Sequence, residues 1–227
     1  MNEKQTRKDK TTSLMLEHDY YQQGHQYIFG IDEAGRGPMA GPLVAAAVCL
    51  PLDDIEHVLE VLKGVKDSKK MTRRQRENAV DAIQSIALAW GVGEVSAQEI
   101  PKIGNMTTVT YTAMHRALNN AFTDMISQPD VLFVDYLTLP DYDAIPQESL
   151  VKGESKSLSI AAASVLAKVY RDNQMIAYAQ DYPDYGFDKH KGYITKAHRA
   201  ALEHYGPCPI HRTNYAPVQA AYQRHNT

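Results

Sequence analysis

Two acidic residues stand side by side directly before a glycine-rich turn. Asp32 and Glu33 end an apolar run that starts near Tyr27, and the turn Gly35-Arg36-Gly37 follows them. Carboxylates at the end of a buried strand can bind a hard cation, glycines let the backbone approach a ligand, and arginine pairs well with phosphate. This stretch therefore predicts a site at which a cation and a phosphate could meet.

Two further acids stand where they could join this site. Asp135 ends a second apolar run, and Asp172 lies in a helix predicted over Ser157–Tyr178. One face of that helix carries Ser157, Ala161, Ser164, Lys168 and Asp172. Because the first members are small, the helix can pack closely and bring Asp172 to the other acids. The alternatives are that the strand-end aspartates only cap helices or form turns, and that the helix presents an alanine stripe to the core and a solvated end.

Carboxylates that converge in this way would repel one another strongly unless cations held them. Oxygen donors suit magnesium or manganese, so the acids predict a pair of divalent ions about 3.5–4 Å apart that promote phosphoryl transfer. Strand alternation would send Asp32 and Glu33 to opposite faces of the sheet. Both can serve one site only if the chain turns at Glu33, which Gly35 would make easy.

Other catalytic motifs are not found in the sequence. The glycine-rich turn lacks the Gly-Lys-Ser/Thr of a P-loop, and Pro38 and Pro42 would disrupt the helix that opens a dinucleotide site. There is no His-Glu-x-x-His metal motif and no Gly-x-Ser-x-Gly nucleophile elbow. Cys49 and Cys208 have no metal-binding spacing, and Cys49 is expected to be a reduced core residue.

The order of elements predicts one α/β domain with a mixed sheet. Of the 227 residues, 44% are hydrophobic, enough for a substantial core. We predict a polar and loosely held tail over 1–26 with a short helix near Ser13–Gln23, a core over 27–180 and a C-terminal extension over 181–227. Strands are predicted over Tyr27–Asp32, Leu43–Leu50, Ile86–Val95 and Val131–Asp135. Helices are predicted over Asp53–Leu62, Ser96–Ile100, Met106–Met125, Ser157–Tyr178 and Thr195–His204. A further helix is predicted to end at Gln84, with Ser68 or Thr72 as its cap. A polar connection is predicted over Leu139–Gln147, and an extended tail is predicted at the end.

Charge and polarity suggest where the protein acts. The net charge of −3 does not by itself indicate a nucleic-acid binder, but basic residues cluster within 66–76 and 189–199 and could flank an anionic substrate. No stretch reaches the roughly 18 apolar residues of a membrane span. The polar N-terminus has no apolar signal region behind it, so the cytoplasm of a bacterial-type cell is expected.

Several motifs, taken in order, resemble one family. They are Gly30–Gly37, Lys66-Asp67-Ser68-Lys69-Lys70, Val134-Asp135, Lys152–Ser157, Ser159–Asp172 and Lys189-His190-Lys191-Gly192-Tyr193. From Tyr27 to Pro217 the chain resembles the type 2 ribonucleases H, in particular bacterial ribonuclease HII. The related ribonuclease HIII lacks the Gly-Arg-Gly turn and usually carries an extra N-terminal domain, so the turn favours type HII.

The resemblance implies a ribonuclease H-like fold. We expect the protein to be a monomer. The resemblance also implies cleavage of RNA in RNA–DNA hybrids and cleavage 5′ to single ribonucleotides embedded in duplex DNA, leaving a 5′-phosphate and a 3′-hydroxyl. The family's four acids, which bind two Mg²⁺ or Mn²⁺ ions, fall on Asp32, Glu33, Asp135 and Asp172.

The resemblance also assigns the contacts with the substrate. Gly35, Arg36 and Gly37 would read the 2′-hydroxyl that distinguishes RNA from DNA. Tyr193 would stack on the neighbouring deoxyribose. The expected phosphate contacts are Lys66, Ser68 and Ser164.

Two rival functions remain open. A catalytically silent protein that binds hybrids would keep the basic clusters and Tyr193 but would not need four acids at these places. Another metal-dependent nuclease of the same fold, for instance one acting on DNA junctions, would have no 2′-hydroxyl to read. The turn at Gly35–Gly37 therefore favours an enzyme that recognises ribonucleotides.

Overall fold

A mixed five-stranded sheet forms the centre of the computed structural model, which describes residues 11–123 and 128–225. The strand order is β3-β2-β1-β4-β5, where β1 pairs antiparallel with β2 and parallel with β4. The strands are β1 (Ile28–Ala34), β2 (Leu43–Cys49), β3 (Ala89–Val95), β4 (Val131–Asp135) and β5 (Gln147–Leu150). The predicted α/β class with a mixed sheet is confirmed.

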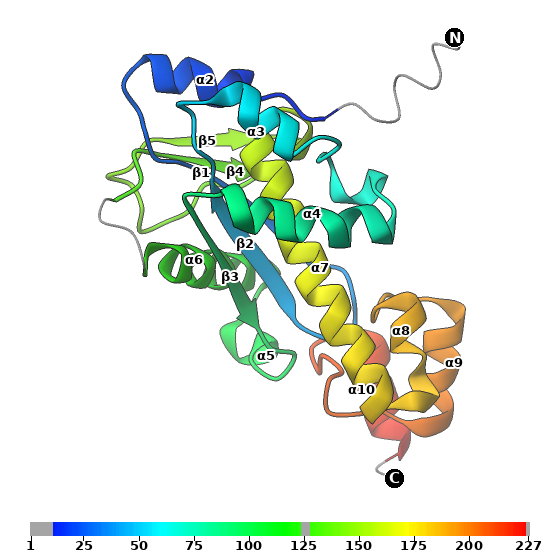
Figure 1. The fold of residues 1–227 in the computed structure, drawn as a ribbon. Helices are drawn as coiled ribbons and strands as arrows, with labels where there is room; N and C mark the ends of the chain where they lie inside the picture. Colours follow the sequence, from blue (N-terminus) through cyan, green and yellow to red (C-terminus); the bar gives the residue numbers. More distant parts are fainter. Residues whose placement is uncertain (1–10, 124–127, 226–227) are drawn as a thin grey trace.

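Helices cover both faces of this sheet (Figure 1). Alternation along β1 sends Ile28 to a core shared with α7 (Leu158–Asp181) and sends Phe29 and Ile31 to a core shared with α6 (Met106–Phe122). The strand β3 lies very close to α6, because a Cβ atom at Gly93 would meet the Ala113 carbonyl oxygen at 2.1 Å. A side chain at this position would therefore collide with the helix backbone, so glycine is needed here.

The remaining helices surround this core. Thr72 caps α4 and exchanges hydrogen bonds with Gln75 in a capping box, so Thr72 rather than Ser68 begins that helix. The other helices are α2 (Met15–Gln22), α3 (Ile55–Val61), α4 (Arg73–Ile86), α5 (Ile100–Ile103), α8 (Phe187–His190), α9 (Lys196–Tyr205) and α10 (Ala216–His225). Among the described helices, none is long and apolar enough to cross a membrane.

The C-terminal helices pack together at the far end of α7 (Figure 1) and hold two smaller hydrophobic clusters. One cluster includes Ala40 and the other includes Met39, and both residues belong to the segment between β1 and β2. The extension therefore packs against the chain directly after the glycine-rich turn.

Several sequence predictions are corrected. The last residues form the helix α10 instead of an extended tail, and β5 lies at the end of the predicted polar connection. The helix predicted over Ser96–Ile100 is instead α5 over Ile100–Ile103, with Pro101 in its first turn, where the missing N–H of proline is not needed.

The segment around α2 is also not a loosely held tail. Leu14 is buried, and the buried carboxylate of Glu17 accepts hydrogen bonds from the Ser157 hydroxyl at 2.7 Å and from the Ser159 amide at 2.9 Å. These groups belong to the first turn of α7 and its cap, so α2 is docked onto the N-terminus of that helix.

Candidate active site

The site begins where two neighbouring parallel strands end together. Ile31 of β1 pairs with Val134 of β4, so the next residues along both strands, Asp32 and Asp135, lie side by side. Alternation turns both carboxylates to the face covered by α7. Asp32 is only 7% exposed, and Asp135 accepts a hydrogen bond from the Gly153 amide at 2.7 Å. The pairing predicted from the two strand ends is therefore present.

Glu33 reaches the same cavity without the turn that the sequence predicted. β1 continues through Ala34, which still pairs with Val44, and the left-handed backbone first appears at Gly35 with φ of +102°. The parallel pairing with β4 stops at Ile31, however, so Glu33 has a strand neighbour on only one side. Its carboxylate forms an ion pair with Arg36 at 3.8 Å and lines the same cavity as Asp32.

Burial and mutual repulsion define the electrostatics of these acids. Burial raises the pKa of Asp32 well above its usual range, and the nearby charges of Glu33 and Asp135 raise it further. Burial also raises the pKa of Glu33; Arg36 opposes this shift and Asp135 adds to it. The ionised carboxylates are thus costly to hold together, and a cation between them would lower that cost.

Asp172 is paired with basic side chains. It accepts a hydrogen bond from Lys168 at 2.7 Å and lies 3.9 Å from Arg76. The predicted helical stripe does bring Ser164 and Lys168 to the cavity that Asp32 and Glu33 line, but neither Asp172 nor Asp135 is among the residues that line it. Within the described residues, no three or more Asp, Glu, His or Cys side chains are arranged to hold a metal ion.

The donor set nevertheless suits a hard divalent cation. Asp32, Glu33 and Asp135 offer carboxylate oxygens, the ligands that Mg²⁺ and Mn²⁺ prefer. A hydrogen bond from Ser164 further supports the charged form of Asp32. The residues present therefore fit such an ion, and the fit rests on their chemistry and on their mutual repulsion.

A cavity of about 380 Å³ joins Asp32 and Glu33 to the glycine-rich turn. Ser68 and Ser164 line it and share a hydrogen bond of 2.9 Å between their hydroxyls. Tyr193 also lines it, with its ring centroid 5.9 Å from the Arg171 guanidinium. The full lining is Asp32, Glu33, Ala34, Gly35, Arg36, Gly37, Ser68, Lys69, Ser164, Lys168 and Tyr193.

Lys66 is the one predicted substrate contact placed elsewhere. It lines a separate cavity of about 320 Å³ with Lys70, Ser155 and the chain at 11–13. Sequence reasoning in turn missed Lys69, which lines the acid-bearing cavity and whose charge favours the ionised form of Glu33. A lysine one residue after Ser68 in a basic run carries no local signal that separates it from Lys66.

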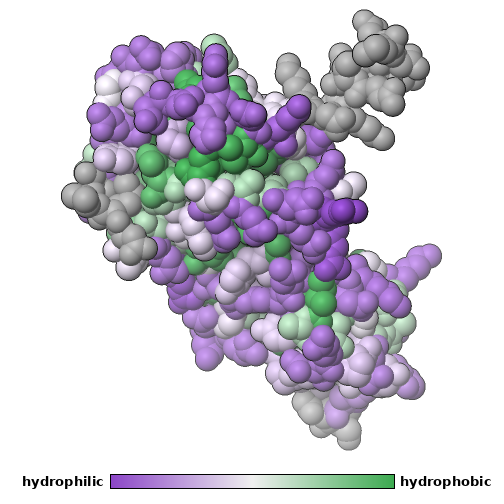
Figure 2. Space-filling view, in the orientation of Figure 1, coloured by the Kyte–Doolittle hydropathy of each residue, from purple (hydrophilic) through white to green (hydrophobic). Residues whose placement is uncertain are grey.

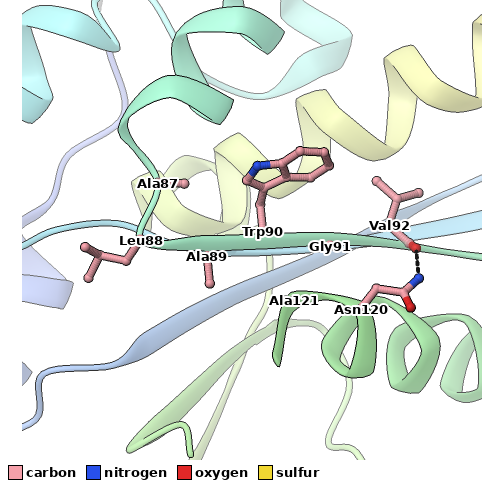
Figure 3. Close-up of a pocket in the computed structure, with 8 residues that line it drawn as sticks. All are labelled: Ala87, Leu88, Ala89, Trp90, Gly91, Val92, Asn120 and Ala121. Atoms are coloured by element: carbon pink, nitrogen blue, oxygen red, sulfur yellow. Dashed lines mark hydrogen bonds between the residues drawn. The ribbon is translucent and has the colours of Figure 1, made fainter. Parts of the chain in front are cut away.

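A larger cavity of about 450 Å³ lies at the open edge of β3 (Figure 3). It is lined by residues 87–92 with Asn120 and Ala121, and the Asn120 amide donates a hydrogen bond to the Val92 carbonyl. None of these side chains is ionisable, so this larger cavity offers no acid or base for chemistry.

The surroundings of the acid-bearing cavity suit a charged ligand. Hydrophilic side chains dominate the face on which α4 and the C-terminal helices lie (Figure 2). Arg73 and Arg76 belong to α4, and Lys189 and Lys191 lie at α8. The two basic clusters of the sequence thus lie on elements that both pack against α7.

Comparisons with known proteins agree with this geometry. The family model of ribonuclease HII matches residues 29–218. A ribonuclease HII of Clostridioides difficile is 46% identical over 204 residues, which cover 90% of this chain and 75% of the relative. The crystal structure of ribonuclease H2 from Pyrococcus horikoshii OT3 superposes with a TM-score of 0.73 and 27% identity, over 88% of this chain and 99% of that one. The structure of a ribonuclease HIII in complex with Mn²⁺ has a TM-score of 0.67 at 20% identity, over 90% and 71% of the two chains, and shows a shared fold.

Proposed function

The chain belongs to the ribonuclease HII family, and from this premise we propose that it cleaves duplex DNA on the 5′ side of a single embedded ribonucleotide. The family places it among the metal-dependent endonucleases that hydrolyse RNA in RNA–DNA hybrids. The expected products are a 5′-phosphate and a 3′-hydroxyl, formed by a monomer.

One observation carries this proposal: the cavity that contains the buried carboxylates is also lined by the turn Gly35–Gly37. A nuclease that acts on DNA alone has no 2′-hydroxyl to recognise, whereas an enzyme selective for ribonucleotides must test the sugar beside the scissile bond. Because Asp32, Glu33 and the turn line the same cavity, a sugar held against the turn would lie close to the acids. This arrangement also disfavours a silent hybrid-binding protein, because a binding surface gains nothing from repelling carboxylates.

The proposal assigns the acids to two divalent ions, Mg²⁺ or Mn²⁺. Asp32 would contribute to both, Glu33 and Asp135 would complete one site, and Asp172 would complete the other after leaving Lys168. When bound, such ions activate a water for in-line attack on phosphorus and stabilise the leaving 3′-oxygen. The chain's own contribution is to gather the carboxylates at one place and to exclude bulk water at buried Asp32. Ser164 partly offsets the cost of ionising Asp32, and Arg36 and Lys69 partly offset that of ionising Glu33.

The remaining residues would bind and orient the substrate. Ser68 and Ser164 can donate hydroxyl hydrogen bonds to a phosphate, and Lys69 and Lys168 can neutralise its charge. Tyr193, whose side chain is 44% exposed, can stack on the deoxyribose next to the ribonucleotide. Lys66 would contact a phosphate farther along the duplex, since it lines a different cavity.

A single assay tests the proposal. A labelled duplex with one ribonucleotide and an all-DNA control of the same sequence are incubated with Mg²⁺, with Mn²⁺ or with chelator. We expect a cut 5′ to the ribonucleotide in both metals, no cut in chelator and no cut in the control. Cleavage of the all-DNA duplex would favour the junction-nuclease alternative, and binding of both hybrids and single-ribonucleotide duplexes without any cleavage would favour the silent binder.

A further inference from the structure

Two buried arginines bind the backbone of the segment that contains the glycine-rich turn and links β1 to β2. Arg212, from the C-terminal extension, is 0% exposed and donates hydrogen bonds to the carbonyl oxygens of Gly35 at 2.6 Å and Arg36 at 3.2 Å. It also donates to those of Gly41 at 2.8 Å and Pro42 at 2.9 Å. One planar guanidinium thus connects both ends of the segment that links β1 to β2.

Its neighbour Arg171 completes this support from α7. Arg171 is also 0% exposed and donates to the carbonyls of Pro42 at 2.9 Å and Ala40 at 3.2 Å. Among the described residues, neither arginine forms an ion pair with a carboxylate. Two buried positive charges are therefore stabilised by backbone carbonyl oxygens, which makes a precise arrangement of that backbone necessary.

A tyrosine from the same extension adds one more contact. The Tyr215 hydroxyl donates to the Arg36 carbonyl at 2.7 Å, and its ring centroid lies 5.8 Å from the Arg212 guanidinium. The Arg36 carbonyl thus receives hydrogen bonds from both Arg212 and Tyr215. Arg212 is buried and Tyr215 is half-buried, and neither lines the cavity that Gly35–Gly37 line.

Peptide geometry turns this support into a consequence for recognition. In a trans peptide the carbonyl of one residue and the N–H of the next point in opposite directions. When the carbonyls of Gly35 and Arg36 point inward to Arg212, the N–H groups of Arg36 and Gly37 must therefore point outward. In the described part of the chain, no group accepts a hydrogen bond from either N–H. A cation on the carbonyl also polarises the peptide and strengthens its N–H as a donor.

We propose that Arg212 and Tyr215 are positioning residues for sugar recognition: they hold the turn so that the N–H groups of Arg36 and Gly37 face the 2′-oxygen of the ribonucleotide. This inference rests on the proposed function and deepens it. It assigns part of the discrimination between ribose and deoxyribose to residues of the C-terminal extension that do not line the cavity.

The test measures the preference for ribose directly. In an Asp32→Asn background that does not cleave, the dissociation constants of a single-ribonucleotide duplex and of the matched all-DNA duplex are compared in Mg²⁺. Their ratio reports recognition of the 2′-hydroxyl. Adding Tyr215→Phe should reduce the ratio about five-fold, the order expected for one hydrogen bond. Adding Arg212→Lys should reduce it about ten-fold or more, because a lysine cannot reproduce the four bonds of the fork.

A matched control is available in the same extension. The Tyr185 hydroxyl donates to the Gly206 carbonyl, also at 2.7 Å, but Gly206 lies outside the turn. Tyr185→Phe removes an equivalent hydrogen bond and should leave the ratio unchanged. Thermal unfolding of each variant shows that it is folded, and Tyr215→Phe decides the question if Arg212→Lys does not fold.

The possible outcomes separate the two proposals. If the Asp32→Asn protein already binds both duplexes equally, the proposed reading of the sugar is wrong. The positioning role alone is wrong if the Asp32→Asn protein prefers ribose and this preference is fully kept when Tyr215→Phe or Arg212→Lys is added to the folded protein. An equal loss in Tyr215→Phe and Tyr185→Phe would also overturn it, because that result reflects general destabilisation of the extension.

Discussion

Gly30 of β1 lies directly against Ile160 of α7: a Cβ atom at Gly30 would stand 2.2 Å from the backbone nitrogen of Ile160. The strand and the helix are therefore in backbone contact, which no other residue type would allow at this point. Two residues along β1 is Asp32, and one turn along α7 is Ser164, which supports the charge of Asp32. The absence of a side chain at Gly30 thus sets how close α7 comes to the acids.

The first prediction follows from this contact. Gly30→Ala should force α7 away from β1, destabilise the fold by about 1–3 kcal/mol as overpacking does, and shift Ser164 and Lys168 relative to Asp32. Cleavage should fall by about 100-fold, since displacements near 1 Å at a catalytic site have effects of that size. Chemical denaturation and single-turnover cleavage at low temperature check both effects. A folded variant with normal cleavage would show that the close approach does not control the site.

A second prediction concerns the most buried acid. Asp32→Asn should lower cleavage by about 1,000-fold or more, because the acids act as one unit, while affinity for the hybrid should change little. The same substitution should raise the unfolding temperature in the absence of divalent ions. Burial and the neighbouring charges of Glu33 and Asp135 raise the pKa of Asp32, so removing its charge relieves an unfavourable interaction at neutral pH. Retained turnover would contradict the catalytic assignment of Asp32. An unchanged unfolding temperature would contradict the unfavourable electrostatic environment described for its carboxylate.

A third prediction separates ion binding from catalysis. Mg²⁺ or Mn²⁺ should raise the unfolding temperature of the unmodified protein. At a free ion concentration of a hundred times the dissociation constant, the free energy of unfolding should increase by about 2.7 kcal/mol. Asp32→Asn should lose most of this gain. Potassium chloride at matched ionic strength serves as the control for general screening of surface charge. The same rise in both proteins, or with potassium alone, would argue against an ion held by these carboxylates.

A fourth prediction uses two histidines in the C-terminal extension. His198 and His211 are buried with their Nε2 atoms 3.1 Å apart, and burial lowers the pKa of His198 to about 3 and that of His211 to about 4. The ordinary value is 6.5. Between about pH 4 and pH 6.5 the folded chain therefore binds fewer protons than the unfolded chain, and stability should fall as the pH drops.

This effect has a measurable slope. Urea unfolding between pH 4.5 and pH 7.5 should show stability increasing with pH, and His211→Gln should reduce the slope by up to about 1.4 kcal/mol per pH unit. If His211→Gln gives the same slope as the unmodified protein, His211 is not kept neutral by the fold.

The sequence predicted those parts of the site that local patterns encode. The bounds of β4, Val131–Asp135, match because an apolar run between polar neighbours marks a buried strand. The pairing of Asp32 with Asp135 was predicted because both end such runs. The sequence predicts that Glu33 needs a turn to reach the site, but the structure has no turn there. Glu33 has no strand neighbour on one side because the pairing of β1 with β4 ends at Ile31, and the sequence of β1 does not reveal where β4 ends.

Other features depend on contacts between distant segments. The stripe on α7 identified the correct face but could not show that Asp172 pairs with Lys168 and Arg76. The helix α10 buries only Val218 and Ala221, too few apolar residues for a visible period. Glu17 looked like one polar residue among many, and its role appears only once the first turn of α7 lies above it.

The hydrogen bond between Arg212 and the Gly35 carbonyl joins residues 177 positions apart, and this separation has a consequence for the order of events during synthesis. The chain leaves the ribosome from its N-terminus, and earlier segments begin to fold first. All four proposed metal ligands, from Asp32 to Asp172, precede the arginine and the tyrosine that support the turn. A growing chain can therefore assemble its sheet and its acids while the glycine-rich turn is still without Arg212. Selectivity for ribose would be the last property that a newly made molecule acquires, and truncation before Arg212 would remove that support while leaving every acid in place.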